Sequence, residues 1–333
     1  MMEVVIFPLV FILSLLFSLY GTPIARNAGI KFGIVDKPDG VLKTHKEPTP
    51  YLGGLSIYLS FLIALSLVFE FNRETLGILF GGSIISTLGL IDDIGKLSPR
   101  IKIIGELLAV YILIKSGIYI RLWFIPEYLS IPLTFLWMIG IINAFNLIDV
   151  MDGLSAGVAF VASSIFFIIA IITENPSVAI ISMALSGACL GFLNYNYNPA
   201  SIFMGDSGSL FLGFLLSSIS IMLDYTKLNK FGFIAPLFVL WIPIFETAYL
   251  FFIRISKGLS PFKGSRDHTS MRLRALYNLS VRKTVGIFYF LSFLSGIAGI
   301  LNILFSFYFS LFSFLILIIF STFAWIILGK AKV

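Results

Sequence analysis

Eleven long apolar runs, separated by short polar segments, follow one another along the chain. A helix needs about 20 largely apolar residues to cross the hydrocarbon core of a bilayer, and most of the runs approach that length. They cover residues 4–24, 52–69, 75–91, 101–116, 130–147, 154–173, 177–193, 208–223, 231–254, 284–303 and 305–328. The pattern predicts an all-α polytopic membrane protein with about 11 transmembrane helices, in which residues 1–333 form a single integral membrane domain.

Composition agrees with this interpretation. The chain is 58% hydrophobic and 12% charged, with a mean hydropathy of +1.01, whereas a soluble domain carries roughly 25% charged residues. The first run follows Met-Met-Glu and has no basic stretch or small-residue cleavage site, which predicts a retained helix and not a removed signal peptide. Cys189, the only cysteine, lies in an apolar run and is expected to be a buried hydrophobic residue.

The distribution of Lys and Arg predicts the orientation, because cytoplasmic loops of membrane proteins are enriched in these residues. With the N-terminus outside and the C-terminus in the cytoplasm, 18 of the 23 Lys and Arg residues fall on the inner side. The net charge of +6 is then explained by membrane topology, and we expect no nucleic-acid partner. The main inner segments are residues 25–51, 92–102, 146–153, 194–207 and 254–283.

Aspartate is segregated in the same direction. Eight of the nine Asp residues fall on the inner side, together with both histidines, His45 and His268, whereas most Glu residues fall on the outer side. Carboxylates that only solvate a surface have no reason to segregate by side-chain length. Short carboxylates gathered with basic residues and histidine on one face indicate a site for a metal ion and a phosphorylated ligand.

Asp92 and Asp93 end the third apolar run, and Arg100 and Lys102 follow in the same short loop. Two adjacent carboxylates at the end of a span are costly unless they face water, a cation or a shared proton. The helix dipole also disfavours negative charge at a C-terminal end, so a compensating cation is expected. The alternative is a plain acidic pair at a helix end.

Asn143, Asn146, Asp149 and Asp152 recur every three residues where the fifth run closes. On a helix this spacing places oxygen-bearing side chains along one stripe. Such a stripe is expensive in an apolar context and is usually functional. The alternative is ordinary capping of the helix end.

A second polar motif runs from Asn194 through Asn196 to the sequence FMGDSGS, which spans Phe203 to Ser209 and opens the eighth run. Gly, Asp and Ser at a helix start can simply cap the helix. The same arrangement offers free backbone N–H groups to a phosphate, and Asp206 offers oxygen ligands to Mg²⁺.

The last inner loop, residues 254–283, is rich in basic residues and also carries Arg266, Asp267 and His268. A solvated loop that binds the lipid surface is the alternative to a substrate-binding role. Glu106 and Glu246 lie inside apolar runs; a tertiary hydrogen bond explains each as well as function does, so neither is assigned to the site.

Taken together, these motifs resemble the polyprenyl-phosphate N-acetylhexosamine-1-phosphate transferases (glycosyltransferase family 4). The matching segments are Val35 to Pro38, Thr49 to Gly54, the Asp92–Asp93 pair, Asn143 to Gly153 and Phe203 to Gly208. The predicted number of spans is similar to that of the bacterial branch that acts on UDP-N-acetylglucosamine.

The resemblance implies Mg²⁺-dependent transfer of N-acetylglucosamine-1-phosphate from UDP-N-acetylglucosamine to undecaprenyl phosphate at the cytoplasmic face of the inner membrane, with Mn²⁺ as an alternative ion. The implied partners are a UDP-N-acetylhexosamine, polyprenyl phosphate and membrane lipid; a homodimer is left open. It assigns the metal to Asn146 and Asp206, and the role of base to Asp92 with Asp93 as a neighbour or alternative ligand. The remaining implied residues of the catalytic and substrate-binding site are Asp149, Asp152, His268, Asn196, Phe203, Arg266, Arg100, Lys102 and Asp36.

The chain departs from the family pattern at two places. His268 is not followed by the usual second histidine, since Thr269, Ser270 and Met271 come next, and the ninth run carries Glu246 where the family usually has Asp. The missing histidines argue against a muramoyl-pentapeptide donor, which stays an alternative. A transporter is the alternative of a different class. A transporter typically has inverted repeats and polar groups at the midplane, whereas the polar motifs of this chain gather on one face. A structural scaffold would not segregate its aspartates.

Overall fold

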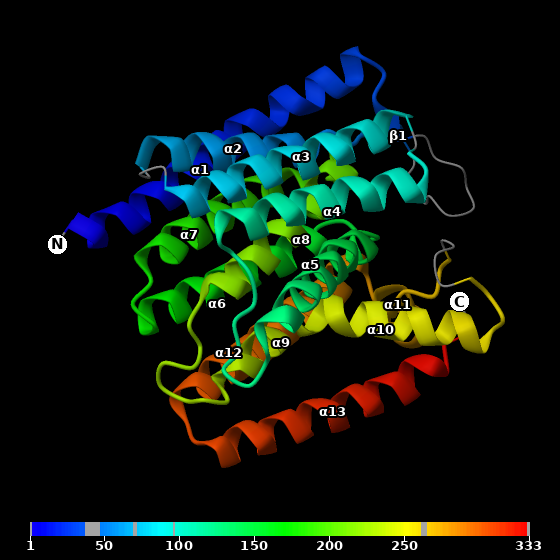
Figure 1. Cartoon of the computed structure of the whole chain (residues 1–333). Coiled ribbons are helices and arrows are strands. Elements are labelled where there is room, and N and C mark those ends of the chain that lie inside the picture. Colours follow the sequence, from blue (N-terminus) through cyan, green and yellow to red (C-terminus); the bar gives the residue numbers. More distant parts are fainter. Residues whose placement is uncertain (1, 37–46, 69–71, 96, 261–264, 332–333) are drawn as a thin grey trace.

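The computed structural model describes residues 2–36, 47–68, 72–95, 97–260 and 265–331, and within them the protein is almost entirely helical. Figure 1 shows long helices packed side by side, with the short strands near one end of the bundle. The long helices are α1 (Met2–Lys31), α2 (Gly53–Val68), α3 (Arg73–Gly95), α4 (Pro99–Ser116), α5 (Glu127–Ile148), α6 (Leu154–Ile172), α7 (Pro176–Asn196), α8 (Gly205–Met222), α10 (Trp241–Ser256), α12 (Val281–Leu304) and α13 (Phe307–Gly329). The shorter elements are β1 (Val35–Asp36), β2 (Thr49–Pro50), η1 (Gly232–Ile234), α9 (Ala235–Val239) and α11 (Thr269–Tyr277).

Helix starts follow from local sequence. Ser98 caps α4 and Asn175 caps α7, each through a side chain that accepts a backbone N–H, and a proline follows each cap at the first helical position. Ser280 caps α12 in the same way. These residues satisfy N–H groups that have no partner within the helix, which fixes where each helix begins.

The ninth apolar run is broken. It folds as η1, α9 and α10, and the axis bends by 69° between residues 232–239 and 241–256. Pro243 lies in the first turn of α10. A proline has no N–H to donate to the carbonyl four residues earlier, and its ring clashes with that carbonyl, so a continuous helix through Val239 is disfavoured.

All of the predicted apolar runs fall on helices, but not all of these helices can cross a membrane by length and composition. Among the described residues, eight helices qualify, or nine if the bent pair counts as one span. Helix α2 has only 16 residues, and α4 carries Arg100, Lys102, Glu106 and Lys115. The protein is a multi-pass membrane protein, while the count of eleven and the orientation of the termini stay predictions.

Helix α8 lies at the centre of the fold and α13 at its edge. Helix α8 packs against α2, α3, α5, α6 and α7, and 78% of its apolar stretch is buried, against 11% for α13. Gly54 and Gly208 bring α2 and α8 into backbone contact, because a Cβ on Gly54 would lie 2.1 Å from the Gly208 nitrogen. This close approach holds the N-terminal end of α8 rigidly within the bundle.

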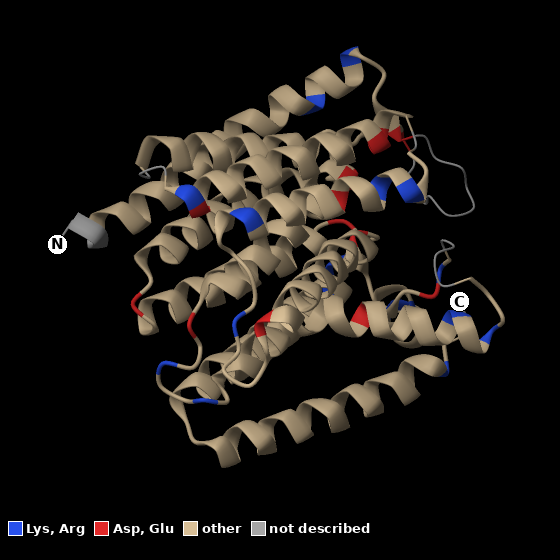
Figure 2. Cartoon of the chain, in the orientation of Figure 1, with Lys and Arg blue, Asp and Glu red and all other residues tan. Residues whose placement is uncertain are grey.

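Charged residues gather at the two ends of the bundle, with long uncharged helical stretches between them (Figure 2). The segments expected on the inner side meet at one end, where Asp93 contacts residues 206 and 207 and Arg282 contacts Asn198. Much of the expected inner loop 25–51, including His45, lies outside the described residues.

Candidate active site

Asp93 fixes the start of α8. One carboxylate oxygen accepts the backbone N–H of Asp206 at 2.8 Å, and the other accepts that of Ser207 at 3.1 Å. Gly205, with φ +73°, makes the turn into the helix, and a Cβ there would lie 2.6 Å from Asp93 Oδ2. Asp93 therefore acts as a cap supplied by α3, and it determines where the Asp206 side chain is presented.

The chain just before α8 is held from the other side by the segment that leads into α2. Phe203 donates its N–H to the Pro50 carbonyl at 2.8 Å, and the Phe203 and Met204 carbonyls accept the N–H groups of Gly53 and Gly54 at 3.0 and 2.8 Å. Asp36 lies in β1 opposite Thr49 of β2. The family-like segments 35–36, 49–54 and 203–208, far apart in sequence, are thus adjacent in space.

Four side chains from four helices form the centre of the site. Lys102 of α4 places its Nζ 2.5 Å from Asp206 Oδ2 and 3.2 Å from Asp92 Oδ2. Asn146 of α5 donates from Nδ2 to Asp206 Oδ1 at 2.8 Å and to Ser209 Oγ at 3.0 Å. Asp92 also accepts the N–H of Leu97 at 2.6 Å. The predicted base Asp92 and the predicted ligand Asp206 therefore share one ammonium group, and the other predicted ligand, Asn146, contacts Asp206.

Asp149 lies at the C-terminal cap of α5, close to an excess of negative charge. Burial, together with the nearby carboxylates of Asp206, Asp93 and Asp152, raises the pKa of Asp149 to about 8. A carboxyl group that is this hard to ionise indicates a place where added positive charge is favourable.

Asp152 and Asn196 shape the loop between α7 and α8. Asp152 Oδ2 accepts from Asn198 Nδ2 at 2.8 Å and from the Ala200 N–H at 3.0 Å. The buried Asn196 amide accepts the N–H of Gly153 at 3.0 Å and donates to the Ile202 carbonyl at 2.9 Å. Both side chains are thus bound to the backbone that carries residues 198–206, and they position this wall of the site.

Glu106 joins the network, although the sequence did not assign it to the site. It is 0% exposed on α4, one turn after Lys102, and its Oε2 accepts from Asn143 Nδ2 at 2.7 Å. Its Oε1 has no hydrogen-bond partner in the described part of the chain. The signal in the sequence was the spacing: Glu106 follows Lys102 by four residues and Asn143 precedes Asn146 by three, so each pair shares a helix face.

His268 lies in a separate cluster at the cytoplasm-facing loop predicted for residues 254–283. It is 5% exposed, and its Nδ1 lies 2.8 Å from Glu246 Oε1 on α10. Glu246 was likewise left out of the site by the sequence and is the direct partner of His268. The two predicted substrate-binding arginines, Arg266 before His268 and Arg100 at the start of α4, are exposed.

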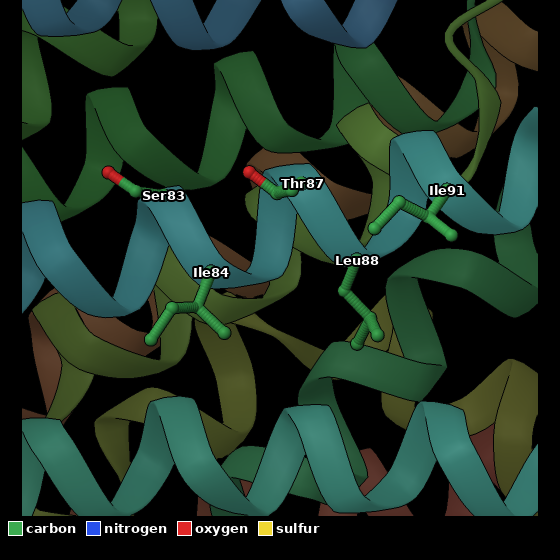
Figure 3. Close-up of a pocket in the computed structure, with 5 residues that line it drawn as sticks. All are labelled: Ser83, Ile84, Thr87, Leu88 and Ile91. Atoms are coloured by element: carbon green, nitrogen blue, oxygen red, sulfur yellow. The ribbon is translucent and has the colours of Figure 1, made fainter.

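A shallow, mainly apolar depression runs along α3 towards Asp92. Ile84 and Leu88 point to the side of α4, whereas Ser83 and Thr87 point the other way (Figure 3). Ile91 closes the row immediately before the acidic pair. The depression lies outside the polar cluster and contributes no charged group to it.

Comparison of the sequence with known proteins agrees with the site described above. The profile of glycosyl transferase family 4 matches residues 75–224, which hold Asp92, Asp93, Asn146 and Asp206. A protein of Bacillus subtilis (strain 168), named probable undecaprenyl-phosphate N-acetylglucosaminyl 1-phosphate transferase, is 34% identical over 320 residues, covering 93% of this chain and 88% of that protein. The chain belongs to glycosyl transferase family 4. The resemblance based on the sequence motifs is therefore confirmed, and the protein is a transferase.

Other relatives of this family 4 transferase differ in their named substrates. The decaprenyl-phosphate N-acetylglucosaminephosphotransferase of Mycolicibacterium smegmatis is 29% identical over 303 residues, covering 80% of this chain and 74% of that protein. The phospho-N-acetylmuramoyl-pentapeptide-transferase of Caldicellulosiruptor bescii is 36% identical over 216 residues, covering 58% of this chain and 67% of that protein.

The central cluster of this family 4 transferase fits a hard cation that takes few protein ligands. Among the described residues, no three His, Cys, Asp or Glu side chains are close enough to hold a metal by themselves. Mg²⁺ is usually held by one or two carboxylates together with waters and substrate phosphates. Asp206 supplies one carboxylate, and rotation of the Asn146 amide would turn its oxygen towards the same point. The Lys102 ammonium between Asp92 and Asp206 marks a position that already favours positive charge.

Proposed function

We propose that this protein transfers N-acetylglucosamine-1-phosphate from UDP-N-acetylglucosamine to undecaprenyl phosphate, releasing UMP, at the cytoplasmic face of the inner membrane. The observation that carries the proposal is the cluster of Asp92, Lys102, Asn146 and Asp206, drawn from four helices. A cation-binding carboxylate, a lysine and a second carboxylate on one surface are what an attack of one phosphate on another requires. The membrane setting supplies the lipid substrate.

In the proposed reaction, an oxygen of the lipid phosphate attacks the phosphorus atom that carries the sugar. The bond from this phosphorus to the bridging oxygen breaks, and UMP leaves with that oxygen. The sugar C1–O bond is not broken, so the anomeric configuration is retained. Mg²⁺, when bound, neutralises charge on the donor diphosphate and polarises its oxygens.

Each residue of the cluster has a role that its contacts support. Asp206 and Asn146 would hold the ion, and Asp93 keeps Asp206 in place through the cap on α8. Lys102 pairs with substrate phosphate oxygens, since its ammonium lies within reach of both carboxylates that face the centre. Asp92 keeps the lipid phosphate deprotonated. Asp149, Asp152, Asn196 and Phe203 line the adjoining wall formed by residues 149–206.

Two facts favour the acetylglucosamine donor over a muramoyl-pentapeptide donor. The Bacillus subtilis relative aligns over nearly the whole chain, whereas the pentapeptide transferase of Caldicellulosiruptor bescii aligns over 58% of it. The loop around His268 also lacks further histidines. A site that hydrogen-bonds one particular hydroxyl can reject an analogue without it by a factor on the order of 10⁴.

The test is a transfer assay with purified protein, undecaprenyl phosphate, Mg²⁺ and radiolabelled donor. We expect UMP release and labelled lipid, with UDP-N-acetylglucosamine at least about tenfold faster than UDP-N-acetylgalactosamine or UDP-muramoyl-pentapeptide, a margin of about 1.4 kcal/mol in transition-state binding. Faster turnover of the pentapeptide donor would change the substrate but not the reaction. No UMP and no labelled lipid with any donor would refute the proposed function.

A further inference from the structure

Glu246 and His268 form a buried pair outside the central cluster. Glu246 is 3% exposed and His268 is 5% exposed, and the distance from Glu246 Oε1 to His268 Nδ1 is 2.8 Å. Glu246 lies on α10, on the second half of the broken span, while His268 immediately precedes α11. A buried carboxylate at this distance from Nδ1 fixes which ring nitrogen carries a proton and how the ring is turned.

The carboxylate is itself held in place. It accepts the backbone N–H of Thr269, at 3.1 Å to Oε2, and Oε2 also accepts the Thr269 hydroxyl. With both oxygens engaged, the Glu246 side chain has little freedom to turn away from His268. The imidazole Nε2 lies on the far side of a rigid ring, and it makes no hydrogen bond to any described residue.

A second buried contact fixes the loop on the other side of His268. The fully buried Arg272 donates to Asp267 Oδ1 at 2.5 Å and to the carbonyls of Leu328 and Ala331, each at 3.1 Å. Lys257 also reaches Asp267 Oδ1, at 2.6 Å. His268 therefore sits between an anchor on α10 and an anchor on the C-terminal end of α13, so its backbone is as well defined as its ring.

We propose that Glu246 is a positioning residue for His268: it binds the Nδ1–H and thereby directs Nε2 to an oxygen of the donor diphosphate. The part that concerns the diphosphate rests on the proposed function. Glu246 itself touches no substrate, since both of its oxygens are bound to the residues that begin α11. The basic residues of the same loop, including the exposed Arg266, provide the positive surroundings that a diphosphate needs.

The link between the two side chains is tested by ¹⁵N-histidine NMR of the full-length protein without substrate. The chain has two histidines, so His45→Asn leaves His268 as the only signal. We expect Nδ1 to carry the proton in this background. Glu246→Leu, which removes the acceptor, should shift the proton towards Nε2, and Glu246→Gln, which keeps an acceptor of the same length, should retain it on Nδ1. An unchanged tautomer in Glu246→Leu would overturn the proposal.

Kinetics tests the consequence for transfer. Loss of a partner that orients a functional side chain typically costs about 10–100-fold, so we expect a fall of that size in kcat for Glu246→Leu, with Glu246→Gln within about tenfold of the natural protein. Thr269→Val is the matched control: it removes the hydroxyl that contacts Glu246 but leaves the pair intact, and kcat should change by less than about threefold. Equal losses in all three variants would indicate a merely structural role and would refute the proposal.

Glu246→Asp gives an independent result if Glu246→Leu does not fold. It keeps the charge but withdraws the carboxylate by about 1.5 Å, which is too far to hold Nδ1 at 2.8 Å. A natural tautomer with full activity in Glu246→Asp would also refute the proposal. The spectrum needs no substrate, so the two proposals can fail separately. If the tautomer changes in Glu246→Leu but the natural protein releases no UMP, the proposed function is contradicted and the Glu246–His268 link still stands.

Discussion

Replacement of each acid in the Asp92–Asp93 pair by alanine should affect thermal stability very differently, although the residues are adjacent in sequence. Both carboxylate oxygens of Asp93 accept hydrogen bonds, from the backbone N–H groups of Asp206 and Ser207. Asp92 contacts the loop N–H of Leu97 and the Lys102 ammonium at the surface of the site. We therefore expect Asp93 to act through the fold and Asp92 through the chemistry.

The magnitude follows from the contacts. A hydrogen bond to a charged acceptor contributes roughly 1.5–3 kcal/mol, and loss of a helix cap costs about 0.5–2 kcal/mol. Two hydrogen bonds of this kind at the start of the most buried helix give an expected loss of about 3–6 kcal/mol for Asp93→Ala. The ion pair of Asp92 is partly exposed, and pairs of that kind contribute up to about 1 kcal/mol, so Asp92→Ala should be destabilised far less.

The assay compares thermal unfolding and transfer rates of the two purified variants. Asp93→Ala should unfold at a clearly lower temperature and lose activity because Asp206 is displaced. Asp92→Ala should keep nearly the natural unfolding temperature and still lose activity by at least about 100-fold, the lower range for a general base. An Asp93→Ala protein with natural thermal stability and no activity would refute the capping role and assign Asp93 to the reaction.

Three further predictions follow from the site and the topology. Asp206→Asn and Asn146→Ala should each abolish turnover at saturating Mg²⁺ without unfolding the protein; near-natural rates in either variant would exclude that residue as a ligand. The raised pKa of Asp149, about 8, keeps its carboxyl protonated at lower pH. A cation held nearby at Asp206 favours the ionised form, so Mg²⁺ binding should be coupled to loss of the Asp149 proton. The half-saturating Mg²⁺ concentration should therefore fall by up to about tenfold per pH unit as pH rises towards 8 and then level off. Asp149→Asn should make it independent of pH, and a pH dependence that persists in this variant would assign the proton elsewhere. For topology, Cys189 is buried, so a membrane-impermeant maleimide should label Leu259→Cys, an exposed position, in inverted vesicles but not in intact cells. Labelling in intact cells would contradict the predicted orientation, with the loop 254–283 in the cytoplasm.

The sequence alone determined that the chain is helical and membrane-embedded, because the length and apolarity of each run suffice to predict a helix in lipid. It also determined the family, since Asn143 to Gly153 and Phe203 to Gly208 are local motifs whose residues are read directly. It could not decide which apolar helices span the bilayer. Helix α4 is a doubtful span by composition, since it carries Arg100, Lys102, Glu106 and Lys115, and only the packing shows that Glu106 is buried.

Only the tertiary structure decided the roles of individual acids. Asp92 and Asp93 are equivalent in the sequence, yet one faces Lys102 and the other caps α8, because helix geometry points neighbouring side chains in different directions and α8 packs against only one of them. Glu246 and His268 are 22 residues apart, and nothing local links them. Their contact exists because the bent ninth run and the loop before α11 fold back on each other. The sequence specifies the chemical groups, whereas long-range packing specifies which of them meet.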